Sequence, residues 1–163
     1  MSSIGNDAFR AALARFPSGV TIVSVRDADG ADHGMTVSAF CSLSLDPPLV
    51  LACVDRAATV LPHLRSAAMF GVSILAAGQD ALSVRFADQA VERFEGVPFT
   101  RSTKGPALLD GAVAHLLCRR VSEFDGGDHV ILVGEVESAQ VHGDEPLLYA
   151  LRRYGRFTAD GAR

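Results

Sequence analysis

The chain has 163 residues, of which 48% are hydrophobic and 21% are charged, and we expect residues 1–163 to form one domain. This composition excludes disordered, collagen-like and low-complexity proteins. The formal net charge is −4 and Lys104 is the only lysine, so we expect no nucleic-acid partner. The longest apolar run, residues 49–54, is far shorter than the roughly 18 residues of a membrane span, and no secretory leader is evident. We therefore expect no membrane association and a cytoplasmic location.

The predicted elements begin with a helix that starts at Asn6 or Asp7 and carries Phe9, Leu13 and Phe16 at three- and four-residue spacing. Residues 17–19 end this helix. Residues 19–26 are rich in β-branched side chains and predict a strand, which is followed by a hairpin turn at residues 29–30.

Residues 33–45 alternate almost strictly between apolar and polar side chains, which predicts one long, half-buried strand. One face of this strand carries hydroxyl groups, from Thr36, Ser38, Ser42 and Ser44. Side chains two residues apart on a strand point the same way, about 6.5–7 Å from each other. This hydroxyl row suits a flat, elongated polar ligand such as an isoalloxazine ring with its ribityl phosphate. The alternative is a row that only covers a solvent-facing sheet surface.

The remaining residues predict short strands and helices joined mostly by hairpins. We expect strands at residues 49–54 and 69–75, helices at 59–66 and 79–86, and an irregular stretch at 88–106. Residues 111–124 and 129–141 predict a long hairpin, and we expect residues 146–157 to end the chain as a strand. Six or seven strands with three short helices favour an antiparallel barrel over a doubly wound sheet.

Common catalytic motifs are absent from the sequence. It has no dinucleotide-binding glycine fingerprint, phosphate-binding loop, zinc-protease motif or nucleophile elbow. A Ser-His-Asp triad stays open, because triads assemble in space. The five histidines are dispersed without metal-ligand spacing, so no metal site is predicted. Cys41, Cys53 and Cys118 are widely separated within apolar segments, which predicts reduced, buried thiols.

The segment GMTVSAFCSLSLDPPLVLACVDR, residues 34–56, resembles the flavin-reductase-like domain family, the small reductase components of two-component flavin-dependent monooxygenases. Further similar segments follow in order along the chain. They are FRAALARFPSGVTIVSV at residues 9–25, the blocks at 70–87 and 105–119, GDH with VGEV at 127–136, and PLLY with Tyr154 near the end. The resemblance covers about residues 8–157.

This resemblance implies a mainly β fold, a split antiparallel β-barrel of the Greek-key, FMN-binding type with a few short helices. It also implies a homodimer that passes hydride from NADH or NADPH to FMN, with FAD possible, and a separate monooxygenase that receives the reduced flavin. Two alternatives remain. One is a flavin-binding carrier without turnover, and the other is a related barrel oxidoreductase that acts on another substrate, such as a pyridoxine phosphate or a corrinoid.

The resemblance also assigns site residues by position. His129 matches the histidine near the nicotinamide, and we assign it the catalytic, positioning role. The flavin contacts implied are Thr36, Val37, Ser38, Ala39, Asp55, Arg56, Thr59, Ser83, Arg85, Phe86 and Tyr154. Within this set, Arg85 lies at the expected phosphate end, where a guanidinium favours a dianion. Hydride transfer to a flavin requires stacking and hydrogen-bond donors and no acid–base pair, so the missing catalytic dyad is expected.

Overall fold

The computed structural model describes residues 4–159, and the ends of the predicted domain, residues 1–3 and 160–163, lie outside this range. The described chain is mainly β with three short helices, as expected. The helices are α1 (Asn6–Leu13), α2 (Leu61–Ser66) and α3 (Asp80–Ala87). The strands are β1 (Ser18–Gly19), β2 (Thr21–Arg26), β3 (Asp32–Val37), β4 (Phe40–Leu45), β5 (Pro48–Asp55), β6 (Met69–Ile74), β7 (Phe99–Arg101), β8 (Ala107–Leu109), β9 (Ala114–Gly126), β10 (His129–Val141), β11 (Leu147–Ala150) and β12 (Arg153–Arg156).

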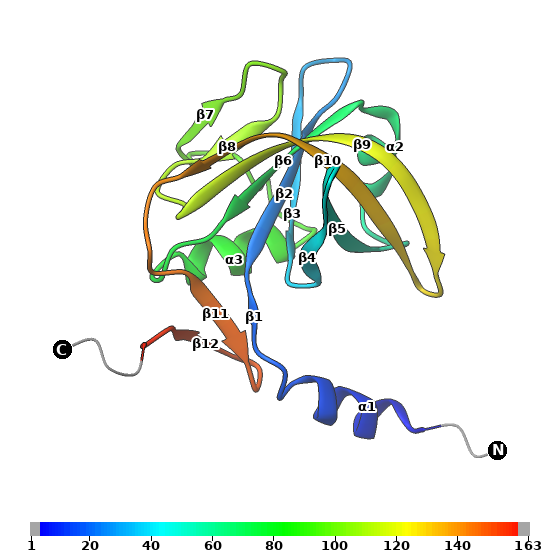
Figure 1. The fold of residues 1–163 in the computed structure, drawn as a ribbon, viewed down its shortest axis with the longest axis vertical. Helices are drawn as coiled ribbons and strands as arrows, with labels where there is room; N and C mark the ends of the chain where they lie inside the picture. Colours follow the sequence, from blue (N-terminus) through cyan, green and yellow to red (C-terminus); the bar gives the residue numbers. More distant parts are fainter. Residues whose placement is uncertain (1–3, 160–163) are drawn as a thin grey trace.

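Seven of the strands form one antiparallel sheet in the order β3-β2-β6-β9-β10-β5-β4 (Figure 1). The two longest strands, β9 and β10, lie near its centre and are joined by a tight turn. Gly127 in this turn has a φ of 81°, a conformation that glycine adopts without steric cost. The hairpin predicted at residues 111–124 and 129–141 is therefore confirmed, with β9 extended by two residues into the turn.

The two edges of the seven-stranded sheet are joined by only two residues. β3 and β4 stand at opposite edges, yet Ser38 and Ala39 alone connect them. A flat sheet of seven strands would separate its edges by about 29 Å, whereas three Cα–Cα steps span at most about 11 Å. The sheet must therefore curl until the end of β3 approaches the start of β4. The backbone N–H of Cys53 on β5 donates to the carbonyl of Ala39 at 2.9 Å and fixes this corner.

The core lies inside the curled sheet and is closed by α2 and α3. One cluster joins β2, β5, β6, β9 and β10 to α2, and a second joins β2 to α3 and β11. Phe70, 2% exposed, packs over Gly134, where an added Cβ would stand 2.4 Å from the phenyl ring. A side chain at position 134 would displace that ring, so the packing of Phe70 against β10 requires glycine.

Several features differ from the sequence expectations. Twelve strands form among residues 4–159 where six or seven were predicted, and β7 lies within the stretch 88–106 that was expected to be irregular. The single strand predicted at residues 33–45 is two strands, because the pairing partner changes from β2 to β5 at Ser38 and Ala39. The thiol of Cys41 is exposed and Cys53 is only partly buried, so the expectation of three buried cysteines is correct for Cys118 alone. Residues 146–157 form the hairpin β11–β12 instead of one strand, with Leu151 and Arg152 at positive φ in its turn.

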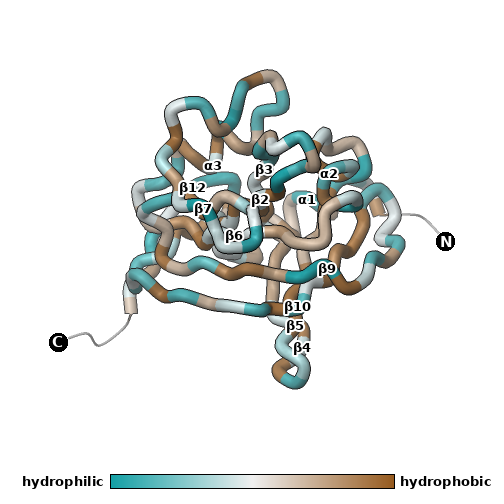
Figure 2. Tube along the Cα trace, turned by 90° about the horizontal axis from the view of Figure 1, so that it is seen from above, coloured by the Kyte–Doolittle hydropathy of each residue, from teal (hydrophilic) through white to brown (hydrophobic). Residues whose placement is uncertain are grey.

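Large apolar side chains are exposed on two projecting elements. Helix α1 lies outside the sheet (Figure 1) and buries none of its residues, so Phe9 and Leu13 are 54% and 52% exposed. The β4–β5 hairpin projects from the body (Figure 2), where Leu43 and Leu45 are 49% and 93% exposed. The predicted burial of these two apolar faces is therefore not met within a single chain. Among residues 4–159, no helix has the length and hydropathy needed to cross a membrane.

The cysteines are expected to differ sharply in reactivity. Burial raises the pKa of the Cys118 thiol to about 12, so the reactive thiolate is scarce at neutral pH. Iodoacetamide should alkylate the exposed Cys41 in the native protein and reach Cys118 only after unfolding in guanidinium. Mass spectrometry of tryptic peptides measures both reactions. Equal native labelling at the two positions would contradict the burial of Cys118 on β9.

Candidate functional site

A cavity of about 720 Å³ lies where the sheet edges approach each other. Its volume falls in the range of about 300–1,000 Å³ that small-molecule sites occupy. Most of its lining is apolar, and among residues 4–159 Arg152 is the only charged residue that contributes to it. The lining includes Phe16, Ser38, Ala39, Leu51, Cys53, Tyr149 and Arg152. We call this space the corner cavity.

The link between β3 and β4 supplies polar backbone groups to the corner cavity. Ser38 and Ala39 lie outside the strand ladders, and within residues 4–159 their N–H groups have no hydrogen-bond acceptor. Such N–H groups need partners from a ligand or from water. The structure therefore places two unpaired donors beside an apolar surface, at two of the positions that the sequence assigned to flavin contact.

The hydroxyl row predicted on residues 36–44 is not continuous. The hydroxyl of Thr36 donates to the carbonyl of Ser83 on α3 at 2.6 Å, so it faces the helix and not the corner cavity. Ser38 lines the cavity, while Ser42 belongs to the projecting hairpin, whose pairing shifts register at this point. The break at Ser38 and Ala39 turns the two halves of the row in different directions.

Three predicted site residues meet beside Tyr149, which lines the corner cavity. The hydroxyl of Tyr154 donates to Oγ of Ser83 at 2.9 Å, and the carbonyl of Ser83 accepts from Thr36. The rings of Tyr154 and Tyr149 lie 5.2 Å apart between centroids, and Tyr149 lines the cavity. Two hydrogen bonds thus connect the β11–β12 hairpin to α3 and α3 to β3.

A second group of predicted residues lies beyond the other end of the cavity. Leu51, Cys53 and Asp55 share one face of β5, since alternate residues of a strand point the same way. Asp55 stands opposite His129 in the ladder between β5 and β10. Nδ1 of His129 lies 2.7 Å from Oδ1 of Asp128, which is the arrangement expected of a hairpin histidine. This hydrogen bond also lowers the pKa of the Asp128 carboxyl.

Arg56 is also at this end, and its guanidinium is held by the β9–β10 turn. Nε of Arg56 donates to the carbonyl of Gly127 at 2.7 Å, and the charge pairs with Asp125 at 2.9 Å. The Asp125 carboxyl is 81% exposed, so water screens its ion pair with Arg56. An anion that binds the guanidinium more strongly can therefore replace Asp125. The pKa of Asp125 is lowered by the N–H of Gly127 first and by Arg56 second.

Of the assigned positions, only Ser38 and Ala39 line the corner cavity. Four of the others are held by contacts elsewhere. The guanidinium of Arg85 donates to the carbonyls of Glu92 and Glu95 at 2.7 and 2.6 Å, so it fastens the loop after α3 instead of facing solvent as a free anion site. Phe86 and Val37 are 0% and 3% exposed, and their side chains belong to the core. Thr59 lines a different cavity, beside α2.

Tyr149 and Arg152 were not among the residues assigned to the flavin site from the sequence. Tyr149 lies within the expected C-terminal strand, but only the turn back through β12 brings it against Tyr154. Arg152 has a φ of 60°, which is uncommon for a residue with a Cβ and not encoded by a turn residue such as asparagine or glycine. No sequence signal could place its side chain at the corner cavity.

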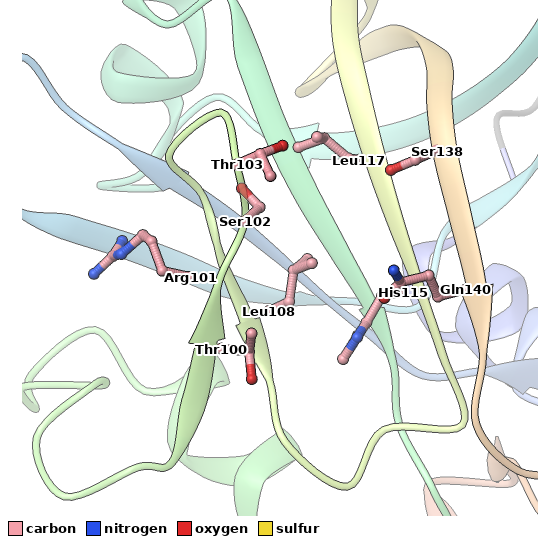
Figure 3. Close-up of a pocket in the computed structure, with 9 residues that line it drawn as sticks. All are labelled: Thr100, Arg101, Ser102, Thr103, Leu108, His115, Leu117, Ser138 and Gln140. Carbon is pink, nitrogen blue, oxygen red and sulfur yellow. The ribbon is translucent and has the colours of Figure 1, made fainter.

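A smaller cavity of about 160 Å³ lies between the β7–β8 hairpin and strands β9 and β10 (Figure 3). Arg101 points away from it and forms a bidentate ion pair with Asp32. Nε2 of His115 donates to the carbonyl of Leu109 at 2.8 Å, and burial lowers the pKa of this histidine. The hydroxyl of Ser102 has no hydrogen-bond partner among residues 4–159, but the volume is too small for a flavin ring.

The corner cavity fits a flavin better than any other described surface. Its apolar walls suit the faces of a flat aromatic ring, and the unpaired N–H groups of Ser38 and Ala39 suit acceptor atoms at a ring edge. Arg152 carries no ion pair within the described chain and supplies positive charge at the cavity. The residues present are therefore compatible with a flavin and a phosphate-bearing tail.

Known proteins match this chain over most of its length. A model of the flavin reductase like domain matches residues 13–158. The chain is 44% identical over 152 residues to the reductase component of 4-hydroxyphenylacetate 3-monooxygenase from Thermus thermophilus, covering 92% of this chain and 95% of that one. It is 42% identical over 148 residues to an actinorhodin polyketide dimerase from Streptomyces coelicolor, covering 89% and 82%.

Among solved structures, the chain resembles the NADH:FAD oxidoreductase of Streptomyces globisporus in complex with NAD and FAD fragments. The TM-score is 0.91 and the sequence identity 37%, with 99% of each chain covered. This chain therefore shares its fold with a protein whose structure contains NAD and FAD fragments.

The hydrogen bond between Tyr154 and Ser83 should contribute measurably to stability. We expect Tyr154→Phe and Ser83→Ala each to lower the free energy of unfolding, with a coupling of about 0.5–1.5 kcal/mol in the double variant. Urea unfolding measures all three variants. Tyr149→Phe is the matched control, because the Tyr149 hydroxyl has no hydrogen bond in the described chain. A coupling below about 0.3 kcal/mol would contradict the contact.

Proposed function

The chain belongs to the flavin reductase like domain family, and we propose that it is an NADH:flavin oxidoreductase that transfers a hydride from NADH to FMN or FAD. The observation that carries this proposal is the match over 99% of both chains to an NADH:FAD oxidoreductase, at a TM-score of 0.91. The corner cavity supports it independently, because its volume and donors suit a flavin.

The residues of the corner cavity would bind and orient the flavin. A bound flavin supplies the hydride acceptor, which no side chain can supply. The N–H groups of Ser38 and Ala39 would donate to the polar ring edge, where negative charge grows during reduction. The hydroxyls of Ser83 and Tyr154 would lie beside the ribityl chain, and Arg152 would attract the phosphate. Arg85 would support the loop after α3 instead of contacting the phosphate.

His129 would position the nicotinamide. It lies at the start of β10, opposite Asp55, and its side chain is 42% exposed, so it can contact a substrate that arrives from solvent. The hydrogen bond to Asp128 fixes the ring, which leaves Nε2 available to a carboxamide group. Its role is to orient the substrate, since hydride transfer requires no proton transfer from the protein.

We further propose that the curled sheet is a split barrel and that two copies associate through the exposed apolar elements. Phe9 and Leu13 on α1, with Leu45 at the tip of the β4–β5 hairpin, expose more apolar surface than an isolated chain favours. Phe16 follows α1 and lines the corner cavity, so a partner that covers α1 would also close the flavin site.

A separate monooxygenase would receive the reduced flavin. One relative is named as the reductase component of a monooxygenase, which implies a second component in that system. The corner cavity opens at the surface among exposed residues, which is compatible with release of the flavin to another protein. A flavin carrier without turnover is the alternative that the following experiment separates.

Steady-state oxidation of NADH by the purified protein tests the proposed reaction. We expect a rate that requires added FMN or FAD, with NADH preferred over NADPH, measured as loss of reduced nicotinamide under anaerobic conditions with stoichiometric flavin reduction. Riboflavin serves as the control for phosphate recognition. Tight flavin binding without any flavin-dependent oxidation of NADH or NADPH would identify a carrier instead.

The same assay with the His129→Ala variant tests whether His129 positions the nicotinamide. We expect kcat/KM for NADH to fall roughly tenfold to a hundredfold, because a displacement of about 1 Å costs this much in rate. Flavin affinity should stay near that of the wild type. The matched control is His142→Ala, because His142 follows the far end of β10. Unchanged NADH kinetics for His129→Ala would leave this histidine with a structural role only.

Sedimentation equilibrium tests the association of two copies. We expect a dimer at micromolar concentration, and we expect the double variant Phe9→Asp with Leu13→Asp to be monomeric with weaker flavin binding. Val141→Asp is the control, because Val141 is an exposed apolar residue on a different element. A wild-type monomer that still binds flavin would contradict the proposed association.

A further inference from the structure

Two histidines and a carboxylate that are distant in the sequence meet beside α2. Asp27 follows β2, His33 lies on β3 and His63 lies on α2, and the β2–β3 turn and α2 stand at the same end of the sheet (Figure 1). Nε2 of His33 lies 2.7 Å from Oδ2 of Asp27, and Nδ1 of His63 lies 3.7 Å from the same oxygen. The three atoms lie within 4.8 Å of one another. We call this group the His-Asp-His cluster.

The carboxylate of Asp27 is oriented toward the two imidazoles by its own turn. Its Oδ1 accepts hydrogen bonds from the N–H groups of Asp29 and Ala31, at 3.0 and 2.8 Å. These bonds leave Oδ2 to face His33 and His63. A fixed, ionised oxygen of this kind is what a metal ligand requires.

From this cluster we infer a binding site for a divalent transition cation of the zinc class, with Asp27, His33 and His63 as its three protein ligands. Imidazole and carboxylate are ligands that Zn²⁺ accepts, and three protein ligands leave a fourth position for water. A tetrahedral ion with bonds of about 2.0–2.2 Å keeps its ligand atoms about 3.3–3.6 Å apart. The two distances from Oδ2 of Asp27 to the imidazole nitrogens, 2.7 and 3.7 Å, bracket this value.

The surroundings allow an ion to enter and a ring to move. The side chains of His33 and His63 are 27% and 33% exposed, and both line a cavity of about 380 Å³. The two rings are stacked, with centroids 3.5 Å apart and planes 12° apart. Because each nitrogen lone pair lies in its ring plane, capture of one ion requires one ring to tilt. His63, the more exposed of the two, faces the cavity that gives it room.

The site would link two elements that are separate in the sequence. Bound to all three ligands, the ion would fasten the β2–β3 hairpin to α2, whose apolar face already packs into the core beside β2. Its action is therefore structural and separate from hydride transfer in the corner cavity. The inference does not rest on the proposed function, and either one can fail without the other.

Isothermal titration of the full-length, metal-stripped protein with ZnCl₂ tests the site. We expect one ion per chain, and a rise in Tm of about 5–10 °C at about a hundred times Kd. Asp27→Asn and His63→Ala should each weaken binding at least tenfold. His142→Ala is the matched control, because His142 and His115 form the other histidine pair of the described chain, with ring nitrogens 3.1 Å apart.

Titration with Co²⁺ distinguishes the cluster from the cysteines. Binding through two imidazoles and a carboxylate gives weak visible absorption only, whereas a thiolate ligand adds an intense near-ultraviolet charge-transfer band. We expect no such band and no change in Cys41→Ser. A cobalt spectrum with the thiolate band, or zinc affinity that Asp27→Asn and His63→Ala leave unchanged, would overturn the inference. So would the absence of zinc binding by the folded wild-type protein.

Discussion

The two-residue link between β3 and β4 is the constraint on which the rest of the structure depends. Because Ser38 and Ala39 must connect opposite edges of a seven-stranded sheet, the sheet has to curl, and its curled interior holds the core. The same link leaves the ladder, so its N–H groups stay unpaired within the described chain. The geometry that curls the sheet therefore also creates the corner cavity and supplies its hydrogen-bond donors.

Much of this fold could be predicted from local pattern, but the link could not. Alternation through residues 33–45 correctly indicated extended backbone, because both halves are strands. Alternation contains no information about which neighbour a strand pairs with, so the change of partner at Ser38 was not visible. The β9–β10 hairpin was predictable because its turn residues, at positions 125–128, encode a tight reversal between two apolar segments.

The candidate site shows the same division between local and spatial information. The resemblance pointed to Thr36, Ser83 and Tyr154, and the fold brings all three together through side-chain and backbone hydrogen bonds. It could not show that Arg85 is engaged by the loop after α3, because that contact depends on how residues 92–95 fold back. The His-Asp-His cluster was likewise invisible, since spacing rules detect ligands on one element and these three come from separate elements.

The exposed apolar surface and the corner cavity belong to one region of the molecule, and this has a physical consequence. Phe16 and Leu13 contribute to the cavity wall, while Leu13 is also half-exposed on α1. A partner that packs against α1 would order the cavity wall as well, so association and flavin binding draw on the same side chains. Ligand binding to a wall that a partner has already ordered costs less conformational entropy. The two proposed equilibria would therefore be coupled, and by linkage each would strengthen the other by the same factor.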